Sequence, residues 1–130
     1  MSDDTLQVEL VAADRLVWSG EANVVNARTA GGEIGILANH MPVLSLLEAG
    51  VVEIETASGE TWLAAVDDGF LSVAGNRVSI LASHAEMASD IDVDQARRDL
   101  DEAKGDGDED RHGAEVRRLE ARVQAAERAS

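Results

Sequence analysis

The 130-residue chain contains no cysteine, only one proline, and only two Trp and one Phe as aromatic residues. The lack of cysteine excludes a disulfide scaffold, a cysteine-ligated zinc or iron–sulfur site and a cysteine nucleophile. The longest unbroken apolar run is Trp62 to Val66, far short of the ~20 residues that a membrane-spanning helix needs. Met1 to Asp4 lack the basic and apolar regions of a signal peptide. We therefore expect a soluble, cytosolic chain that is held at a membrane only through another protein.

Positive charge is also scarce. The chain has 26 Asp and Glu against 11 Lys and Arg, a net charge of -15, and its pI is about 4.3. Such a surface repels phosphate backbones and anionic lipid headgroups, which disfavours nucleic-acid binding and direct lipid insertion. Residues 1–88 hold thirteen acids and three bases, whereas residues 89–130 hold thirteen acids and eight bases. The apolar share of 45% is normal for a chain that buries the core of one domain.

Alternating apolar and polar residues dominate the first two thirds of the chain. This period of two predicts short strands at residues 6–12, 16–18, 24–29, 51–56, 62–66, 70–73 and 77–81. Ser58-Gly59 is predicted as a hairpin turn, because glycine accepts positive φ without a steric cost. Short strands with turn signals about every ten residues predict an antiparallel sandwich or barrel.

The last third of the chain has a helical period. Apolar residues recur at spacings of three, four and three in two sets: Val93, Ala96, Leu100 and Ala103, then Val116, Leu119, Val123 and Ala126. Each set forms one stripe on one helix face. Asp92 is a suitable N-cap, and Gln95 is placed to complete a capping box. Residues 105–113 have no apolar side chain and are predicted to be the loop. The thin stripes predict a hairpin that is held weakly and can rearrange.

Residues suited to catalysis form no recognisable constellation. No serine lies in a nucleophile elbow, and Asp67-Asp68 fits a solvated turn. Residues 32–44 are glycine-rich but lack the ending of a phosphate loop, so we interpret them as a rigid loop at the rim of the sandwich. This loop carries Glu33 and His40, which fit a binding role and an ordinary structural role about equally well. An acid/base or metal-dependent enzyme using Glu33, His40 and Asp67, or a free-standing binding adaptor, stays open as an alternative.

The segment from Gly32 to Leu44 resembles the Gly-Glu-x-Gly-Ile-Leu-Pro-x-His-x-Pro-Leu signature of the epsilon subunit of F-type ATP synthase. Other segments resemble the family in order and spacing: residues 10–22, 50–54, 66–73, 76–82 and 91–96. The resemblance covers essentially the whole chain, and the strands are similar to those of actinobacterial members. Ala38 stands in place of the signature proline, and Asp68 in place of the first glycine of a Gly-Gly-Phe turn.

This resemblance implies a β-sandwich of about ten strands over residues 1–88 and a helix–loop–helix unit over residues 89–130. It implies a non-catalytic rotor subunit in the central stalk, which packs on the gamma subunit and the c-ring at the cytoplasmic face of the cell membrane. Such a subunit couples proton-driven rotation to ATP synthesis, and its hairpin can extend along gamma and inhibit ATP hydrolysis. Glu33 and His40 match the signature residues at the c-ring and gamma contact. No metal or other cofactor is implied.

Some family members bind ATP through an Ile/Leu-Asp-x-x-Arg-Ala motif at the start of the first C-terminal helix. The matching segment here, residues 91–96, has Gln95 in place of the arginine. An amide supplies neither the charge nor the forked donors of a guanidinium. The hypothesis is that ATP binding is weak or absent, with Glu86, Asp92 and Arg97 as the remnants of the site.

Four arginines stand out in the second predicted helix: Arg117, Arg118, Arg122 and Arg128. One interpretation is a solvated face that pairs with nearby acids such as Glu115 or Glu120. The other is that these arginines meet an acidic surface of the catalytic beta subunits, in the alpha/beta head, when the hairpin extends.

Overall fold

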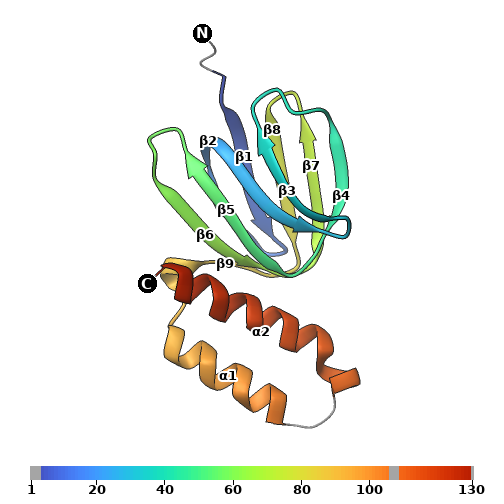
Figure 1. Cartoon of the computed structure of the whole chain (residues 1–130), viewed down its shortest axis with the longest axis vertical. Coiled ribbons are helices and arrows are strands. Elements are labelled where there is room, and N and C mark those ends of the chain that lie inside the picture. Colours follow the sequence, from blue (N-terminus) through green and yellow to red (C-terminus); the bar gives the residue numbers. More distant parts are fainter. Residues whose placement is uncertain (1–3, 106–108, 130) are drawn as a thin grey trace.

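The computed structural model describes residues 4–105 and 109–129, with the strands at one end and two helices at the other (Figure 1). Its strands are β1 (Leu6–Ala12), β2 (Arg15–Thr29), β3 (Gly32–Leu37), β4 (Val43–Leu47), β5 (Gly50–Thr56), β6 (Thr61–Val66), β7 (Gly69–Ala74), β8 (Arg77–Ala82) and β9 (Ala85–Met87). The 3-10 turn η1 (Ala88–Asp90) leads to α1 (Val93–Gly105) and α2 (Glu109–Ala129). The predicted β-sandwich followed by a helical hairpin is confirmed, with nine strands in the described residues where about ten were expected.

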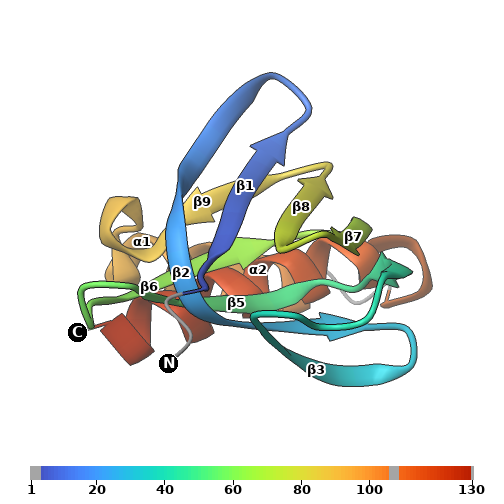
Figure 2. The same cartoon turned by 90° about the horizontal axis from the view of Figure 1, so that it is seen from above.

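Strand β2 belongs to both layers of the sandwich. Its first part pairs with β1 and its second part with β3 and β5, with a register irregularity between Ala22 and Val24. Seen from above, β2 runs from β1 across to β5 (Figure 2). The sequence predicted two separate strands here, at 16–18 and 24–29, and that prediction was wrong. The polar residues between them interrupt the apolar pattern but not the backbone ladder, because hydrogen bonds between strands need no apolar side chains.

One strand pair departs from the expected antiparallel arrangement. Strands β1 and β8 run parallel, with Gln7 opposite Arg77 and Ala12 opposite Ala82. The other pairings among the described residues are antiparallel. Because β1 and β8 lie far apart in the sequence, no local turn fixes their relative direction, and the pattern of either strand alone carries no information about it.

The core confirms the predicted alternation. Leu6, Val8, Leu10 and Ala12 of β1 point inward with 0–5% exposure.

The glycine-rich segment predicted as a rim loop is strand β3, and only residues 38–42 form the loop. A Cβ at Gly35 would lie 3.0 Å from Asn26 Oδ1, the end of a side chain on the facing strand, whereas a Cβ at Gly32 would meet nothing within 4 Å. The glycines therefore do not require a loop, and this segment pairs with β2 as a strand.

Helix α2 lies between the sheet and α1, so it buries two faces (Figure 1). The predicted stripe contributes Leu119 and Ala126, whereas Ala121 and Ala125 lie outside that stripe and are also buried. The second core cluster joins these alanines to Ala65 of β6 and to the partly buried Val51 and Leu63. Neither described helix combines the length and the apolar character that crossing a membrane requires.

The start of each helix tests a prediction. Asp92 Oδ1 accepts hydrogen bonds from the backbone N–H groups of Asp94 at 3.0 Å and Gln95 at 3.2 Å, which confirms the N-cap. The predicted capping box does not form, because Gln95 Oε1, the acceptor that it requires, accepts instead from Arg98 Nη2 at 2.9 Å. Helix α2 begins at Glu109, so the loop predicted for 105–113 was wrong from 109 onward, and residues 106–108 lie outside the described residues.

Candidate functional site

A row of outward-facing apolar side chains crosses five strands on one face of the sandwich. Leu46 of β4 lies opposite Phe70 of β7, and Phe70 lies opposite Leu81 of β8. Leu81 lies opposite Val11 of β1, which in turn lies opposite Leu16 of β2. Four of these side chains are 50–58% exposed: Leu16, Leu46, Phe70 and Leu81. At ~4.8 Å between neighbouring strands, the row extends for about 20 Å. A continuous exposed apolar strip of this kind typically marks a protein interface.

The loop of residues 38–42 forms the end of the sandwich farthest from the helices (Figure 1). Its Asn39 and the β7–β8 turn residue Asn76 both have positive φ, 68° and 62°. Asn39 N–H donates to Asn76 Oδ1 at 2.5 Å, and Asn76 Nδ2 donates to Asn39 Oδ1 at 3.3 Å. Asn39 Nδ2 also donates to Asp4 Oδ2 at 3.1 Å. These bonds hold the loop against the neighbouring turn and the start of the chain.

Three residues of this loop are exposed, Asn39, Met41 and Pro42, and His40 is partly exposed. His40 Nδ1 lies 2.7 Å from the Met41 carbonyl oxygen, and the Met41 side chain is 77% exposed. Leu37 at the end of β3 and Leu44 of β4 are 59% and 73% exposed. Leu44 lies on the same face of β4 as Leu46, so the apolar row continues along β4 toward this loop.

The structure does not bring Glu33, His40 and Asp67 together. Glu33 stands at the start of β3, whereas His40 follows the other end of the same strand. Asp67 lies beyond the Leu47 end of β4, while His40 lies before its Val43 end. His40 is thus separated from both acids by the length of a strand. The acid/base alternative that combined these three residues has no shared site.

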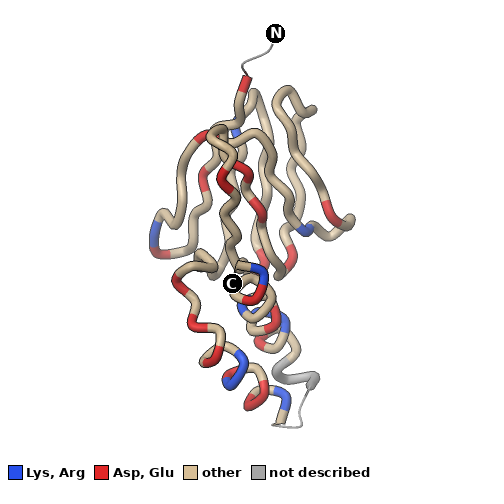
Figure 3. The backbone as a smooth tube through the Cα atoms, turned by 60° about the vertical axis from the view of Figure 1, so that its left-hand side comes forward, with Lys and Arg blue, Asp and Glu red and all other residues tan. Residues whose placement is uncertain are grey.

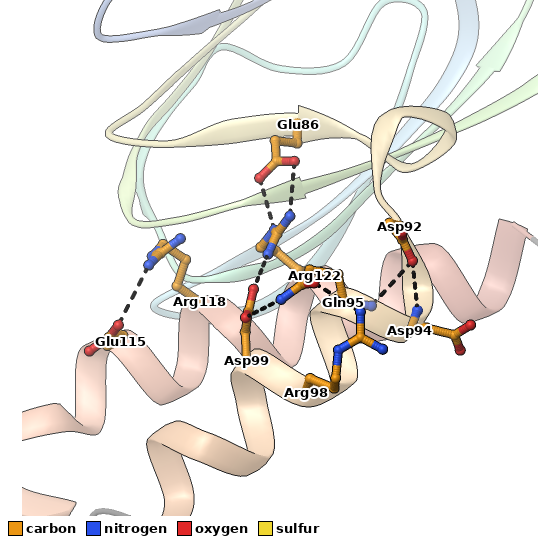
Figure 4. Close-up of polar contacts among 9 residues, drawn as sticks. All are labelled: Glu86, Asp92, Asp94, Gln95, Arg98, Asp99, Glu115, Arg118 and Arg122. Carbon is orange, nitrogen blue, oxygen red and sulfur yellow. Dashed lines mark hydrogen bonds and ion pairs between the residues drawn. The ribbon is translucent and has the colours of Figure 1, made fainter.

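Two arginines of α2 reach across to other elements, and Figure 4 shows the contacts of one of them, Arg122. Arg122 Nε lies 2.9 Å from Glu86 Oε1, but the geometry is that of an ion pair and not of a hydrogen bond. Arg122 Nη2 donates a hydrogen bond to Glu86 Oε2 at 3.3 Å. Arg122 Nη1 also lies 3.5 Å from Asp99 Oδ2 of α1. Arg128 Nη2 donates to Glu53 Oε2 of β5 at 3.0 Å. The Arg122 side chain is 19% exposed, so its charge is largely removed from water.

The other two arginines behave differently. Arg118 Nη2 lies 4.0 Å from Glu115 Oε1 of its own helix, which agrees with the interpretation of a self-paired helical face. Arg117 is exposed and has no ion pair with the residues that the structure describes. The sequence singled out these four arginines, but it did not predict that Arg122 and Arg128 bind acids of the sandwich. Nothing in the local sequence of α2 signals partners 36 and 75 residues away.

The three proposed remnants of an ATP site do not line one shared cavity. Glu86 lines a cavity of about 450 Å³ between the sandwich and α2, together with Arg118 and Arg122. Asp92 caps α1. Arg97 lies 3.7 Å from Asp94 and 3.3 Å from Glu127 of α2. Each of the three residues thus has a partner within the chain, and only Glu86 lines the cavity.

Comparison with known proteins identifies the family of this chain. The model of the ATP synthase Delta/Epsilon chain, beta-sandwich domain, matches residues 5–88. The chain belongs to the ATP synthase epsilon chain family. The ATP synthase epsilon chain of Streptomyces griseus is 51% identical over 120 residues, which cover 92% of this chain and 94% of that one. That of Streptomyces avermitilis is 56% identical over 95 residues, covering 73% and 77% of the two chains. The resemblance inferred from the signature segment is therefore confirmed, including its actinobacterial character.

Chains in two solved ATP synthase structures share the fold of this chain. A chain in a cryo-EM structure of the Euglena gracilis mitochondrial ATP synthase, OSCP/F1/c-ring, has a TM-score of 0.73 at 22% identity. The match covers 97% of this chain and 82% of the Euglena chain. A chain of the Tetrahymena thermophila mitochondrial ATP synthase central stalk and c-ring has a TM-score of 0.55 at 16% identity, covering 73% and 75% of the two chains. The shared fold includes the helical end, which the family model does not reach.

Proposed function

We propose that this chain is the epsilon subunit of a bacterial F-type ATP synthase, a non-catalytic rotor subunit of the central stalk that helps couple proton-driven rotation to ATP synthesis. Its membership of the epsilon chain family and the 51% identity over 92% of its length support this role. As part of that complex it sits at the cytoplasmic face of the cell membrane. Its net charge of -15 excludes direct attraction to anionic lipid, so other subunits hold it there.

The apolar row is the observation that carries the proposal. Leu16, Leu46, Phe70 and Leu81 are each at least half exposed, an arrangement that is unfavourable in water unless a partner covers it. We assign this row to the gamma subunit. The tip with His40 and Met41, which adjoins the row through Leu44 on the same face of β4, suits the c-ring. Glu33 stands at the opposite end of β3 from His40, so a c-ring contact by both residues requires two separate points of attachment.

Co-purification with gamma tests the docking row. Phe70→Glu puts a carboxylate in the middle of the row, and it is expected to lower the amount of chain recovered with gamma at least tenfold. Thr61→Glu, at an exposed position on β6 outside the row, is the matched control and should leave recovery unchanged. The complex is isolated from native membranes and released with low salt or EDTA. Equal recovery of the two variants, with both folded by circular dichroism, would remove the row from the gamma interface.

The same proposal gives the hairpin a regulatory role. Its contact with the sheet consists mainly of alanines, such as Ala121 and Ala125 against Ala65. Small side chains bury little apolar area, so the docked and extended states differ by only a few kcal/mol. When the hairpin extends, Arg117, Arg118, Arg122 and Arg128 meet an acidic surface of the catalytic subunits and inhibit ATP hydrolysis.

ATP binding by the isolated chain is expected to be weak or absent. Gln95 cannot replace a guanidinium, and Glu86, Asp92 and Arg97 are engaged with partners inside the chain. Equilibrium dialysis at millimolar ATP should therefore show no saturable site. Glu86→Gln, dialysed in parallel, tells whether any binding depends on this region. A saturable site that the Glu86→Gln change weakens would refute the expectation.

A further inference from the structure

We infer that Asn39 and Asn76 are positioning residues for the contact of the tip with the c-ring. The hydrogen bonds between their side chains, called here the asparagine clamp, hold the 38–42 loop in the shape that a proline at position 38 would otherwise favour. The inference rests on the proposed contact between the tip and the c-ring. The clamp acts through the loop, because His40 and Met41 directly follow Asn39 in the chain.

Residues 37–40 form a tight turn that favours particular residue types. His40 N–H donates to the Leu37 carbonyl oxygen at 3.2 Å, which closes a turn of four residues. Its third residue, Asn39, has a φ of 68°, whereas Ala38 does not have a positive φ. A positive φ at the third residue alone is characteristic of the type II turn, which favours glycine or asparagine there and proline at the second position. Asn39 fits this preference, and Ala38 does not.

Ala38 leaves the turn with a freedom that a proline would remove. The proline ring fixes φ at about −65°, so it restricts the turn before any partner binds. Position 38 suits a proline, because Leu37 ends strand β3 and the residue before a proline favours an extended conformation. The turn therefore accepts a proline but lacks one, and contacts from outside the turn must hold its shape.

The β7–β8 turn supplies these contacts. Asn76 Oδ1 accepts from Asn39 N–H at 2.5 Å, and Asn76 Nδ2 donates to Asn39 Oδ1 at 3.3 Å. These two bonds run in opposite directions and fix both the backbone and the side chain of Asn39. Asn76 is itself held, since its carbonyl oxygen accepts from Gln7 N–H of β1 at 2.8 Å. Asn39 Nδ2 donates a further bond to Asp4 Oδ2. The loop is thus tied to two segments that are distant from it in the sequence.

Both positions combine a turn conformation with a hydrogen-bonding group. Asn76 has a φ of 62°, and it shares with Asn39 the left-handed region, where asparagine is more frequent than most other residues with a side chain. A glycine adopts this φ without a steric cost but has no side chain to donate or accept. Replacement by glycine therefore removes the bonds of the clamp and keeps the backbone conformation.

The position of the loop matters because its contacts act over short distances. Residues 37–42 include no Lys, Arg, Asp or Glu, whereas both signs of charge line the helices at the other end of the molecule (Figure 3). Apolar contacts and hydrogen bonds need close approach of the atoms that make them. A loop that depends on such contacts binds well only when its residues are already in place.

A held loop raises affinity because the binding conformation is already populated in the free chain. The apparent affinity falls in proportion to the fraction of chains whose loop has that conformation. His40 Nδ1 lies 2.7 Å from the Met41 carbonyl oxygen, so the same loop also orients the imidazole. Without the clamp, His40 and Met41 are spread over several loop conformations.

Binding of the full-length chain to two probes tests the positioning role. Asn76→Gly should lower affinity for a complex of gamma with the c-ring about fivefold and leave affinity for gamma alone unchanged. The apolar row is retained, since Phe70 and Leu81 lie at the ends of β7 and β8 that are far from Asn76. Ser58→Gly is the matched control, because it puts a glycine in the β5–β6 turn and removes a side-chain bond to Thr56 Oγ1. It should leave both affinities unchanged.

Ala38→Pro distinguishes positioning from general stabilisation. In the Asn76→Gly chain it should restore affinity for the complex of gamma with the c-ring, because the ring now restricts the turn. In the otherwise unchanged chain it should alter that affinity by less than about twofold, since the loop is already held. A proline that merely stabilised the fold would act equally in both chains.

Amide hydrogen exchange of the free chain measures the clamp directly. Asn39 N–H belongs to an exposed residue, yet it should exchange slowly because it donates to Asn76 Oδ1. Asn76→Gly should speed this exchange at least about tenfold and leave the amides of the buried Leu71 and Ile80 unchanged, which also shows that the variant is folded. Unchanged exchange at Asn39 would refute the clamp.

The outcomes separate this inference from the function on which it rests. If the original chain binds gamma with the c-ring no more tightly than gamma alone, the c-ring contact is refuted and the positioning role fails with it. If it binds more tightly but Asn76→Gly matches Ser58→Gly, the positioning role is refuted and the c-ring contact stands. A loss of affinity that Ala38→Pro does not restore would contradict the equivalence of clamp and proline. Loss on the c-ring complex alone, with restoration by Ala38→Pro, supports the inference.

Discussion

Removal of residues 89–130 is expected to raise ATP hydrolysis by the assembled enzyme about fivefold. A fivefold change corresponds to a free-energy difference of ~1 kcal/mol between the docked and the extended hairpin. The sandwich should tolerate this truncation, because its main core cluster consists of residues before Ala88 and includes none from α1 or α2. The change uncovers Val51, Leu63 and Ala65 on the outer face of β5 and β6. Hydrolysis is measured at saturating ATP in enzyme reconstituted with either chain.

The control is the amount of truncated chain that remains bound to the enzyme. The apolar row with Leu46, Phe70 and Leu81 is intact in the truncated chain, so binding and ATP synthesis should persist. An unchanged hydrolysis rate, with the truncated chain fully bound, would show that the hairpin does not inhibit. Loss of binding would instead show that the hairpin is needed for assembly. It would contradict the expectation that the sandwich binds the enzyme while the hairpin only regulates hydrolysis.

Gly69→Ala is expected to destabilise the chain by at least ~3 kcal/mol or to prevent folding. A Cβ at this position would lie 1.8 Å from the Leu81 carbonyl oxygen and 2.9 Å from Ala82 Cα. Both are backbone atoms of β8, so no side-chain rotation relieves the clash and β7 must move away from β8. Because Gly69 precedes Phe70, the shift also disturbs the middle of the apolar row.

Chemical denaturation monitored by circular dichroism measures this loss of stability. Gly31→Ala is the matched control, because its Cβ would meet only Thr29 Oγ1 at 3.8 Å and its φ is not in the left-handed region. That change should alter the free energy of unfolding by less than ~0.5 kcal/mol. If the two variants unfold at the same denaturant concentration, the close approach of β7 to β8 at Gly69 does not limit stability.

Local patterns predicted the elements whose burial follows a simple period. The alternation in Leu6–Ala12 predicted an inward face, and the spacing from Leu119 to Ala126 predicted a buried helical stripe. The prediction was wrong for the glycine-rich segment 32–37, because glycines are compatible both with a loop and with a strand, and here the segment pairs with β2. It missed the second buried face of α2, since one apolar stripe is expected for a helix with a single neighbour, and Ala121 and Ala125 contribute to another.

The sequence proposed Glu33, His40 and the four arginines of α2 as contact residues, and that role stays a prediction. It did not predict which of these residues the fold brings near one another. The row formed by Leu16, Leu46, Phe70 and Leu81 comes from four strands, and each of its members looks like an isolated exposed residue in the sequence. Only the strand register joins these residues into one strip.

By itself the sequence determined the two-part organisation, the acidic surface, the absence of cysteine chemistry and membership of the epsilon chain family. These properties depend on composition, on short periods and on ordered motifs, all of which are local. Tertiary structure alone decided that β1 runs parallel to β8, that α2 is the middle layer, and that Arg122 and Arg128 bind Glu86 and Glu53. The physical reason is that contacts between distant segments depend on how layers stack, and neither residue type nor spacing along the chain encodes that directly.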